Sequence, residues 1–247
     1  MLLRSTLLSD IVHGFSTRQG GVSEGRYASL NLGGKWGDDP AVVMENRQRL
    51  ATEAGFSVED LRLARQVHGR VVVTADGVAS DLLLDSEADT VVASWPRLVP
   101  AVLTADCVPI LISDGQGRVA AIHAGWRGTV ARIVEATVAA LVAQGSARSQ
   151  LRAAIGPCIC TACFEVGDEV AAQFDPRFVR TIGKAHIDLQ AANHDQLLAA
   201  GVFENAIDRL ERCTAHEPEW FFSFRRDGAK IGQMMSFIAA GSSATQP

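Results

Sequence analysis

Between residues 99 and 123 the chain carries three short apolar runs in close succession, separated by turn residues. The runs are rich in Val, Ile and Leu, a composition typical of buried strands: Val99–Leu103, Val108–Ser113 and Arg118–His123. After Gly125 the apolar residues recur instead at the spacing of one helix face, as far as Gly145. Any fold for this chain must therefore bury several strands and a helix that follows directly from the third one.

Two further helices are predicted on either side of this centre. Asp39 and Pro40 form an N-cap and first-turn pair, and Gly55 closes the helix that they open. A second helix is predicted over Asp188–Arg212, in one or two pieces because Gly201 interrupts it. The strands and helices do not alternate regularly, which favours an α+β fold over a βαβ fold.

The C-terminal part is predicted to form a hairpin. Two apolar stretches, Trp220–Phe224 and Ile231–Ile238, flank the turn-forming pair Asp227-Gly228. We expect one domain over residues 1–240 and a frayed tail at residues 241–247, which are mostly small and polar.

Composition and charge narrow the class of protein. A chain of 247 residues that is 47% apolar can hold its own core, so a bound metal is expected to be functional. The net charge of −5 argues against nucleic-acid binding. We find neither a secretory signal nor an apolar stretch of membrane-spanning length, and the five cysteines are irregularly spaced. These features predict a cytoplasmic protein with free thiols.

The end of the third apolar run is unusual. His123 ends a predicted strand, and a turn containing Gly125 and Gly128 leads directly into a helix. The imidazole would lie at a strand end, where ligands gather, and the N–H groups of the helix start could bind an anion. The alternative is that the glycines only permit a tight turn and that His123 is a core residue.

Two other segments carry metal-binding side chains. Asp106 and Cys107 lie side by side between two apolar runs, where an unpaired carboxylate would be costly, although a free cysteine is commonly just a small apolar residue. His68 precedes a strand predicted at residues 71–74, and a lone histidine beside a glycine is more often structural.

Together, His68, Cys107 and His123 offer one thiolate and two imidazoles from separate elements. This is the three-ligand pattern of a catalytic zinc, with the fourth position left to water or substrate. The same set could hold type 1 copper. A reducing compartment, and the lack of a close-spaced Cys-x-His-x-Met cluster, favour zinc.

Three more thiols, Cys158, Cys160 and Cys163, crowd one segment, and Cys213 could supply a fourth. Structural zinc sites prefer two separated pairs, and no second cysteine is close to Cys213. We therefore expect a metal-free loop of small buried thiols that helps to wall the active site.

The chain resembles the YfiH family, also called the multicopper polyphenol oxidase or laccase-domain family, over nearly its whole length. The shared motifs occur in the family's order: Gly14–Arg18 with Gly20–Ser23, Ser29–Leu32, Gln66–Gly69, Ala88-Asp89, Thr104–Cys107, His123–Gly128, Ile155–Cys158, Phe164–Gly167 and Ser223–Gly228. The resemblance implies a single-domain layered αββα sandwich and a zinc held by His68, Cys107 and His123. Phe224 departs from the usual tyrosine, and Gln233 from the usual arginine.

The family's function implies phosphorolysis of adenosine, inosine or a related nucleoside to base and ribose 1-phosphate, with deamination of adenosine as a second reaction. Asp106 and Asp89 are the candidates for proton transfer. Phosphate or substrate contacts are expected from Arg18, Asn31, Gly125, Arg127 and Arg225, with Arg225 also counted as catalytic. The expected partners are the nucleoside and phosphate; no protein partner can be inferred.

Two other functions stay open. Copper-dependent phenol oxidation is the older family description, but a four-copper centre needs about ten histidines and this chain has six. A zinc amidase acting on cell-wall precursors is also compatible with the residues. A non-catalytic zinc module is less favoured, because three ligands leave a coordination position open.

Overall fold

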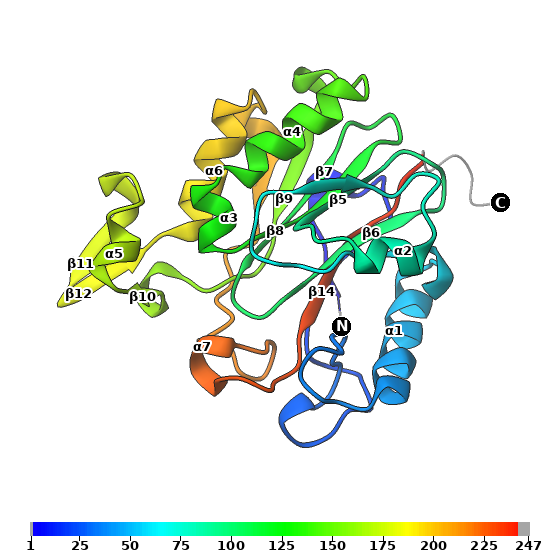
Figure 1. Ribbon diagram of the computed structural model, residues 1–247, viewed down its shortest axis with the longest axis horizontal. Coiled ribbons are helices and arrows are strands. Elements are labelled where there is room, and N and C mark those ends of the chain that lie inside the picture. The colour runs from blue at the N-terminus through cyan, green and yellow to red at the C-terminus, as the bar shows by residue number, and fades with distance from the viewer. Residues whose placement is uncertain (1, 242–247) are drawn as a thin grey trace.

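The computed structural model describes residues 2–241 and contains two β-sheets that lie face to face (Figure 1). One sheet has the strand order β1 (Leu2–Leu3), β2 (His13–Ser16), β14 (Met234–Ile238), β6 (Val99–Thr104) and β3 (Leu61–Arg62). The other has the order β13 (Ile207–Arg209), β9 (Arg152–Ile155), β7 (Val108–Ser113), β8 (Val119–Ala124), β5 (Thr90–Ala93) and β4 (Val72–Thr74). Neighbouring strands are antiparallel except for β3 with β6, β4 with β5 and β13 with β9.

The three predicted central strands are confirmed as β6, β7 and β8. Successive side chains point to opposite faces of a strand, so Leu111 and Ala121 pack between the two sheets. Ile110 and Ile122, their neighbours along β7 and β8, pack on the other face of the six-stranded sheet. Both faces of the six-stranded sheet are buried, so these strands are apolar along most of their length and do not alternate between apolar and polar residues.

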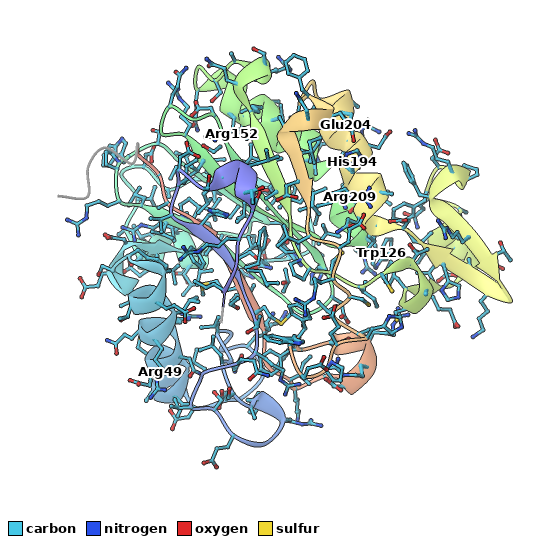
Figure 2. The ribbon with its side chains drawn as sticks, turned by 180° about the vertical axis from the view of Figure 1, so that it is seen from behind. Arg49, Trp126, Arg152, His194, Glu204 and Arg209 are labelled. Carbon is cyan, nitrogen blue, oxygen red and sulfur yellow. The ribbon has the colours of Figure 1, made fainter. Side chains whose placement is uncertain are left out.

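Helices cover the outer face of each sheet. The helices α3 (Trp126–Val130), α4 (Ile133–Ala143) and α6 (Leu189–Ala199) pack on the six-stranded sheet. On the other sheet lies α1 (Pro40–Ala54), whose Leu50 and Ala54 join a core cluster with residues of β6 and β14. Arg49 of α1 and His194 of α6 consequently lie on opposite sides of the molecule (Figure 2). These four layers confirm the expected αββα sandwich.

Local signals set the helix ends. Asp39 caps α1 by accepting a hydrogen bond from the N–H of Ala41, and Gly55 ends the helix with φ = 85°. The helix predicted after Gly125 is divided into α3 and α4, because Arg132 takes a left-handed conformation with φ = 63°.

The predicted helix over Asp188–Arg212 is partly wrong. Its first half forms α6, but after a glycine turn the chain enters β13, which extends the six-stranded sheet beside β9. The residues after Gly201 carry too few apolar side chains to form a helix face, but enough for one short strand at the edge of the sheet.

The predicted C-terminal hairpin is wrong. Ser223 accepts a hydrogen bond from the N–H of Arg226 and caps a short helix, α7 (Phe224–Asp227), which ends at Gly228. The strand β14 pairs with β2 and β6 instead of with residues 220–224. The capping hydrogen bond of Ser223 thus stabilises a helical turn at the residues for which the Asp-Gly pair predicts a hairpin turn.

The remaining elements lie outside these layers. Two short helices are α2 (Ser80–Asp85) and α5 (Asp168–Ala171). A small sheet of β10 (Glu165–Val166), β12 (Lys184–Ile187) and β11 (Val179–Ile182) projects from the body (Figure 1). Within residues 2–241 no helix is both long and apolar enough to cross a membrane. Of the predicted tail, Gly241 donates its N–H to Gly117, and residues 242–247 lie outside the described part.

Candidate metal centre

His68, Cys107 and His123 meet at one edge of the sheets. Cys107 lies in the turn between β6 and β7, His123 is the second-last residue of β8, and His68 precedes β4. One ligand atom from each lies within 4.8 Å of the others. The two imidazole rings are nearly perpendicular, with centroids 4.8 Å apart. The predicted convergence of these side chains is therefore present in the fold.

The register of β7 and β8 explains why Cys107 and His123 are neighbours. Pro109 is paired with His123 and Val108 with Ala124, so the residue preceding β7 lies beside the end of β8. Asp106 turns the chain into β7 with φ = 97°. His68 also has a left-handed backbone, with φ = 61°, which is uncommon outside glycine.

Asp89, at the start of β5, holds two of the ligand segments together. Its fully buried carboxylate accepts hydrogen bonds from the N–H groups of His68 (2.9 Å) and Gly69 (2.6 Å). It also contacts Nδ1 of His123 at 2.7 Å. With Nδ1 engaged in this way, Nε2 of His123 is left to face the ligand cluster.

The electrostatics of the cluster favour a thiolate. Burial raises the pKa of the Cys107 thiol, but His123 and His68 outweigh burial and lower that pKa to about 6. Burial lowers the pKa of His123, whereas Cys107 and Asp89 raise it to about 9. Both shifts favour the thiolate form of Cys107, which is the form that binds a metal ion.

Gly125 leaves space where the ligands meet. A Cβ atom on this residue would stand 3.0 Å from Cδ2 of His68 and 3.1 Å from Sγ of Cys107. The donor set, the carboxylate behind His123 and the missing side chain at Gly125 all fit a bound divalent metal ion. The predicted anion site after Gly125 lies at α3, a helix of only five residues.

Asp106 and Arg225 are connected to each other beside Cys107. The carboxylate of Asp106, which is 8% exposed, accepts hydrogen bonds from the hydroxyl of Thr214 and the N–H of Arg225, both at 2.6 Å. The Arg225 side chain donates to the backbone oxygens of Cys163 (3.0 Å) and Glu165 (2.9 Å). These contacts fix α7 next to the metal ligands.

Two of the other predicted phosphate contacts, Arg18 and Arg127, have partners within the protein. Arg18 donates to the backbone oxygens of Ala28 and Pro218. Arg127 is exposed, and its guanidinium stacks on Trp126 at 4.1 Å.

Asn31 belongs to a separate network. It is fully buried, donates to Asp38 and Gly33, and accepts hydrogen bonds from the N–H groups of Gly33 and Gln233. These contacts hold loops together and leave Asn31 little capacity for a ligand.

Sequence reasoning missed one group of residues. Cys160, Cys163, Cys213 and His216 also converge, with one ligand atom from each within 4.8 Å of the others. The signal was in the sequence, because His216 follows Cys213 by three residues. Only cysteines were considered as partners for Cys213. The expectation of a buried thiol holds for Cys158, which is 3% exposed.

Over most of its length the chain is similar to a family model and to proteins with a stated function. A family model described as multi-copper polyphenol oxidoreductase laccase matches residues 12–241. A purine nucleoside phosphorylase of Deinococcus radiodurans is 41% identical over 243 residues, which cover 96% of this chain and 92% of that protein. Adenosine deaminase RL5, from an unknown prokaryotic organism, is 40% identical, with 92% of this chain and 93% of that protein covered.

The fold is also that of solved relatives. The crystal structure of YlmD from Geobacillus stearothermophilus has a TM-score of 0.89 and 35% identity to this chain, covering 97% of it and 96% of YlmD. That of YfiH from Bacillus licheniformis has a TM-score of 0.87 and 32% identity, covering 93% of this chain and 92% of that chain. The chain therefore belongs to the YfiH family, the family of the multi-copper polyphenol oxidoreductase laccase model.

Proposed function

We propose that this chain is a zinc-dependent purine nucleoside phosphorylase that also deaminates adenosine. The observation that carries the proposal is the convergence of His68, Cys107 and His123, which provides three ligands and leaves a coordination position open. The names of the relatives supply the substrate class. One thiolate and two imidazoles suit zinc, which when bound would act as a Lewis acid toward the group under attack.

The surrounding residues divide between orienting the ligands and handling protons. Asp89 is sealed from solvent and fully engaged with His123 and the His68 turn, so it is a positioning residue. Asp106 lies next to Cys107 and keeps a small exposed area, which makes it the better candidate for proton transfer to the purine or sugar. Its hydrogen bonds to Thr214 and Arg225 hold its two oxygens in fixed directions.

Aromatic and basic groups beside Asp106 suit a nucleoside and phosphate. Phe224, which is 49% exposed, lies 6.0 Å from the ring of Trp36 and offers a surface on which a purine can stack. Arg127 and Arg225 are exposed near Gly125 and Asp106 and are the proposed phosphate contacts. Arg18, which is only partly exposed, and Asn31, which is fully buried, are assigned a supporting role.

The test uses zinc-loaded protein with inosine or adenosine, in the presence and absence of phosphate, and identifies the products by mass spectrometry. Inosine with phosphate is expected to give hypoxanthine and ribose 1-phosphate. Adenosine is expected to give inosine even when phosphate is omitted, because deamination consumes only water. We place the reaction in the cytoplasm, where the thiolate ligand stays reduced.

Two results would reject the proposal. One is the absence of any conversion of purine nucleosides by protein shown to hold its metal. The other is oxidation of a phenol by copper-loaded protein that leaves nucleosides untouched, which would support the laccase description of the family.

A further inference from the structure

A second group of metal-binding side chains lies in two loops beside the active site. Cys160 precedes a single 3-10 turn (Thr161–Cys163) that follows β9, and Cys163 is the last residue of that turn. Cys213 and His216 lie in the segment that follows β13. The ligand atoms of the four residues all lie within 4.8 Å of one another. We refer to these four residues as the Cys3His cluster.

The spacing of the cluster in the sequence is that of a zinc knuckle pair. Cys160 and Cys163 form a Cys-x2-Cys pair, and Cys213 and His216 form a Cys-x2-His pair. Structural zinc sites combine two such short-spaced pairs from separate segments. Cys213 has no second cysteine close to it, but His216 supplies its short-spaced partner.

The distances are compatible with a tetrahedral ion. A zinc–sulfur bond of about 2.3 Å places tetrahedral ligand atoms roughly 3.8 Å apart. Sγ of Cys163 lies 3.1 Å from Nε2 of His216, and Sγ of Cys160 lies 3.8 Å from Nδ1 of the same ring. The two sulfurs face different nitrogens of the His216 ring, so binding of one ion requires the side chains to rotate until a single nitrogen faces the three sulfurs.

The backbone holds the two segments in this arrangement. The N–H of Cys160 donates to Sγ of Cys213 at 3.3 Å, which is the kind of contact that stabilises a thiolate. Cys158 and Cys213 form an isolated parallel bridge, in which Thr214 donates its N–H to the oxygen of Cys158 at 3.0 Å. Glu217 accepts a hydrogen bond from the N–H of Cys213 at 3.1 Å. Backbone hydrogen bonds therefore hold the two segments together independently of a metal ion.

We propose that Cys160, Cys163, Cys213 and His216 bind a second zinc ion, which is structural because the protein supplies all four ligands. The ion joins two segments that are more than forty residues apart in the sequence. Both segments reach the active site: Thr214 donates to Asp106, and the oxygen of Cys163 accepts from Arg225. The second zinc thereby positions Asp106 and α7 without touching the substrate.

The first test is metal analysis of the purified chain and does not depend on any enzymatic activity. The wild-type chain is expected to hold two zinc ions, and the Cys160→Ser/Cys163→Ser variant one. The Cys107→Ala/His123→Ala variant is also expected to hold one, in the Cys3His cluster. The matched control is Cys158→Ala, which removes a buried thiol of the same loop outside the cluster and is expected to leave two ions.

A wild-type chain with one zinc that is unchanged in Cys160→Ser/Cys163→Ser would overturn the proposal. So would a mass for the intact chain that is lower by two hydrogens, which would reveal a disulfide in place of the metal.

If the double serine variant does not fold, cobalt replaces zinc in the Cys107→Ala/His123→Ala chain, whose Cys3His cluster is intact. Thiolate-to-cobalt charge-transfer absorption is then expected, and its loss on adding His216→Ala supports the assignment. Lack of this absorption in the parent chain, with cobalt in excess, rejects it.

Discussion

The proposed active-site ligands and the Cys3His cluster use the same side-chain types but are held in different ways. His68, Cys107 and His123 lie at the edge of the sheets, and a buried carboxylate holds the His68 and His123 segments together. The Cys3His cluster instead lies on two loops, and each loop supplies a short-spaced pair.

This difference matches two different tasks. Ligands on a rigid sheet keep a site accurate while a coordination position stays open to substrate. Two short-spaced pairs on loops can surround an ion completely, and the bound ion then holds the loops together. The metal would in this way stiffen segments that lie outside the sheets. The first arrangement suits chemistry and the second suits the support of that chemistry.

The sharpest separation of the two clusters comes from Cys107→Ala. Loss of the thiolate is expected to remove the active-site metal and reduce nucleoside turnover by about 10³-fold or more, because a metal contributes several kcal/mol to transition-state stabilisation. Steady-state kinetics and metal analysis of the same sample provide the measurement. Retention of turnover within tenfold of the wild type would contradict the assignment of the active metal to this cluster.

The next largest effect is expected from Asp89→Asn. The amide cannot accept from every donor that now surrounds the carboxylate, so His123 loses its fixed orientation, and zinc affinity is expected to fall by about 10- to 100-fold. Competition with a chelator measures this in the Cys160→Ser/Cys163→Ser chain, in which only the active-site zinc is titrated.

Asp114→Asn is the matched control for that experiment. Asp114 is 3% exposed and lies at the other end of β7. Its carboxylate accepts hydrogen bonds from Ser146 and Arg118. Its replacement is expected to lower stability and to leave zinc affinity unchanged. An equal loss of affinity in both variants would mean that Asp89 acts only through general stability.

A smaller effect is expected from Gly125→Ala. The added methyl group would press on His68 and Cys107, at 3.0 and 3.1 Å. Overpacking of this kind costs about 1 kcal/mol or more, which corresponds to roughly fivefold weaker zinc binding. Gly34→Ala is the control, since a Cβ there meets nothing within 4 Å. Unchanged affinity in Gly125→Ala would show that the ligands move aside without cost.

The central strands and the convergence of His68, Cys107 and His123 were predictable from sequence for different reasons. The strands β6, β7 and β8 show as apolar runs because both faces are buried. The ligand set followed from residue type together with the family motifs. The carboxylate of Asp89 could be named as a candidate but its role could not be assigned, because its partners lie about twenty and thirty-four residues away.

Local competition explains the errors. The Asp227-Gly228 pair favours a hairpin, but Ser223 caps a helix that takes up the same residues. The Cys3His cluster was not predicted because the short-spaced partner of Cys213 is a histidine, His216, and not a second cysteine. In both places the deciding residue lies three or four residues away in the sequence.

The pairing of Pro109 with His123 has a consequence for how the active site can fail. Antiparallel registers that keep the same faces buried differ by two residues, or roughly 7 Å along the strand, which is too far for Cys107 and His123 to share one ion. A slip in register therefore abolishes the site instead of loosening it. Across a series of core variants, activity should decline in proportion to the folded fraction, while the catalytic constants of the molecules that remain folded stay constant.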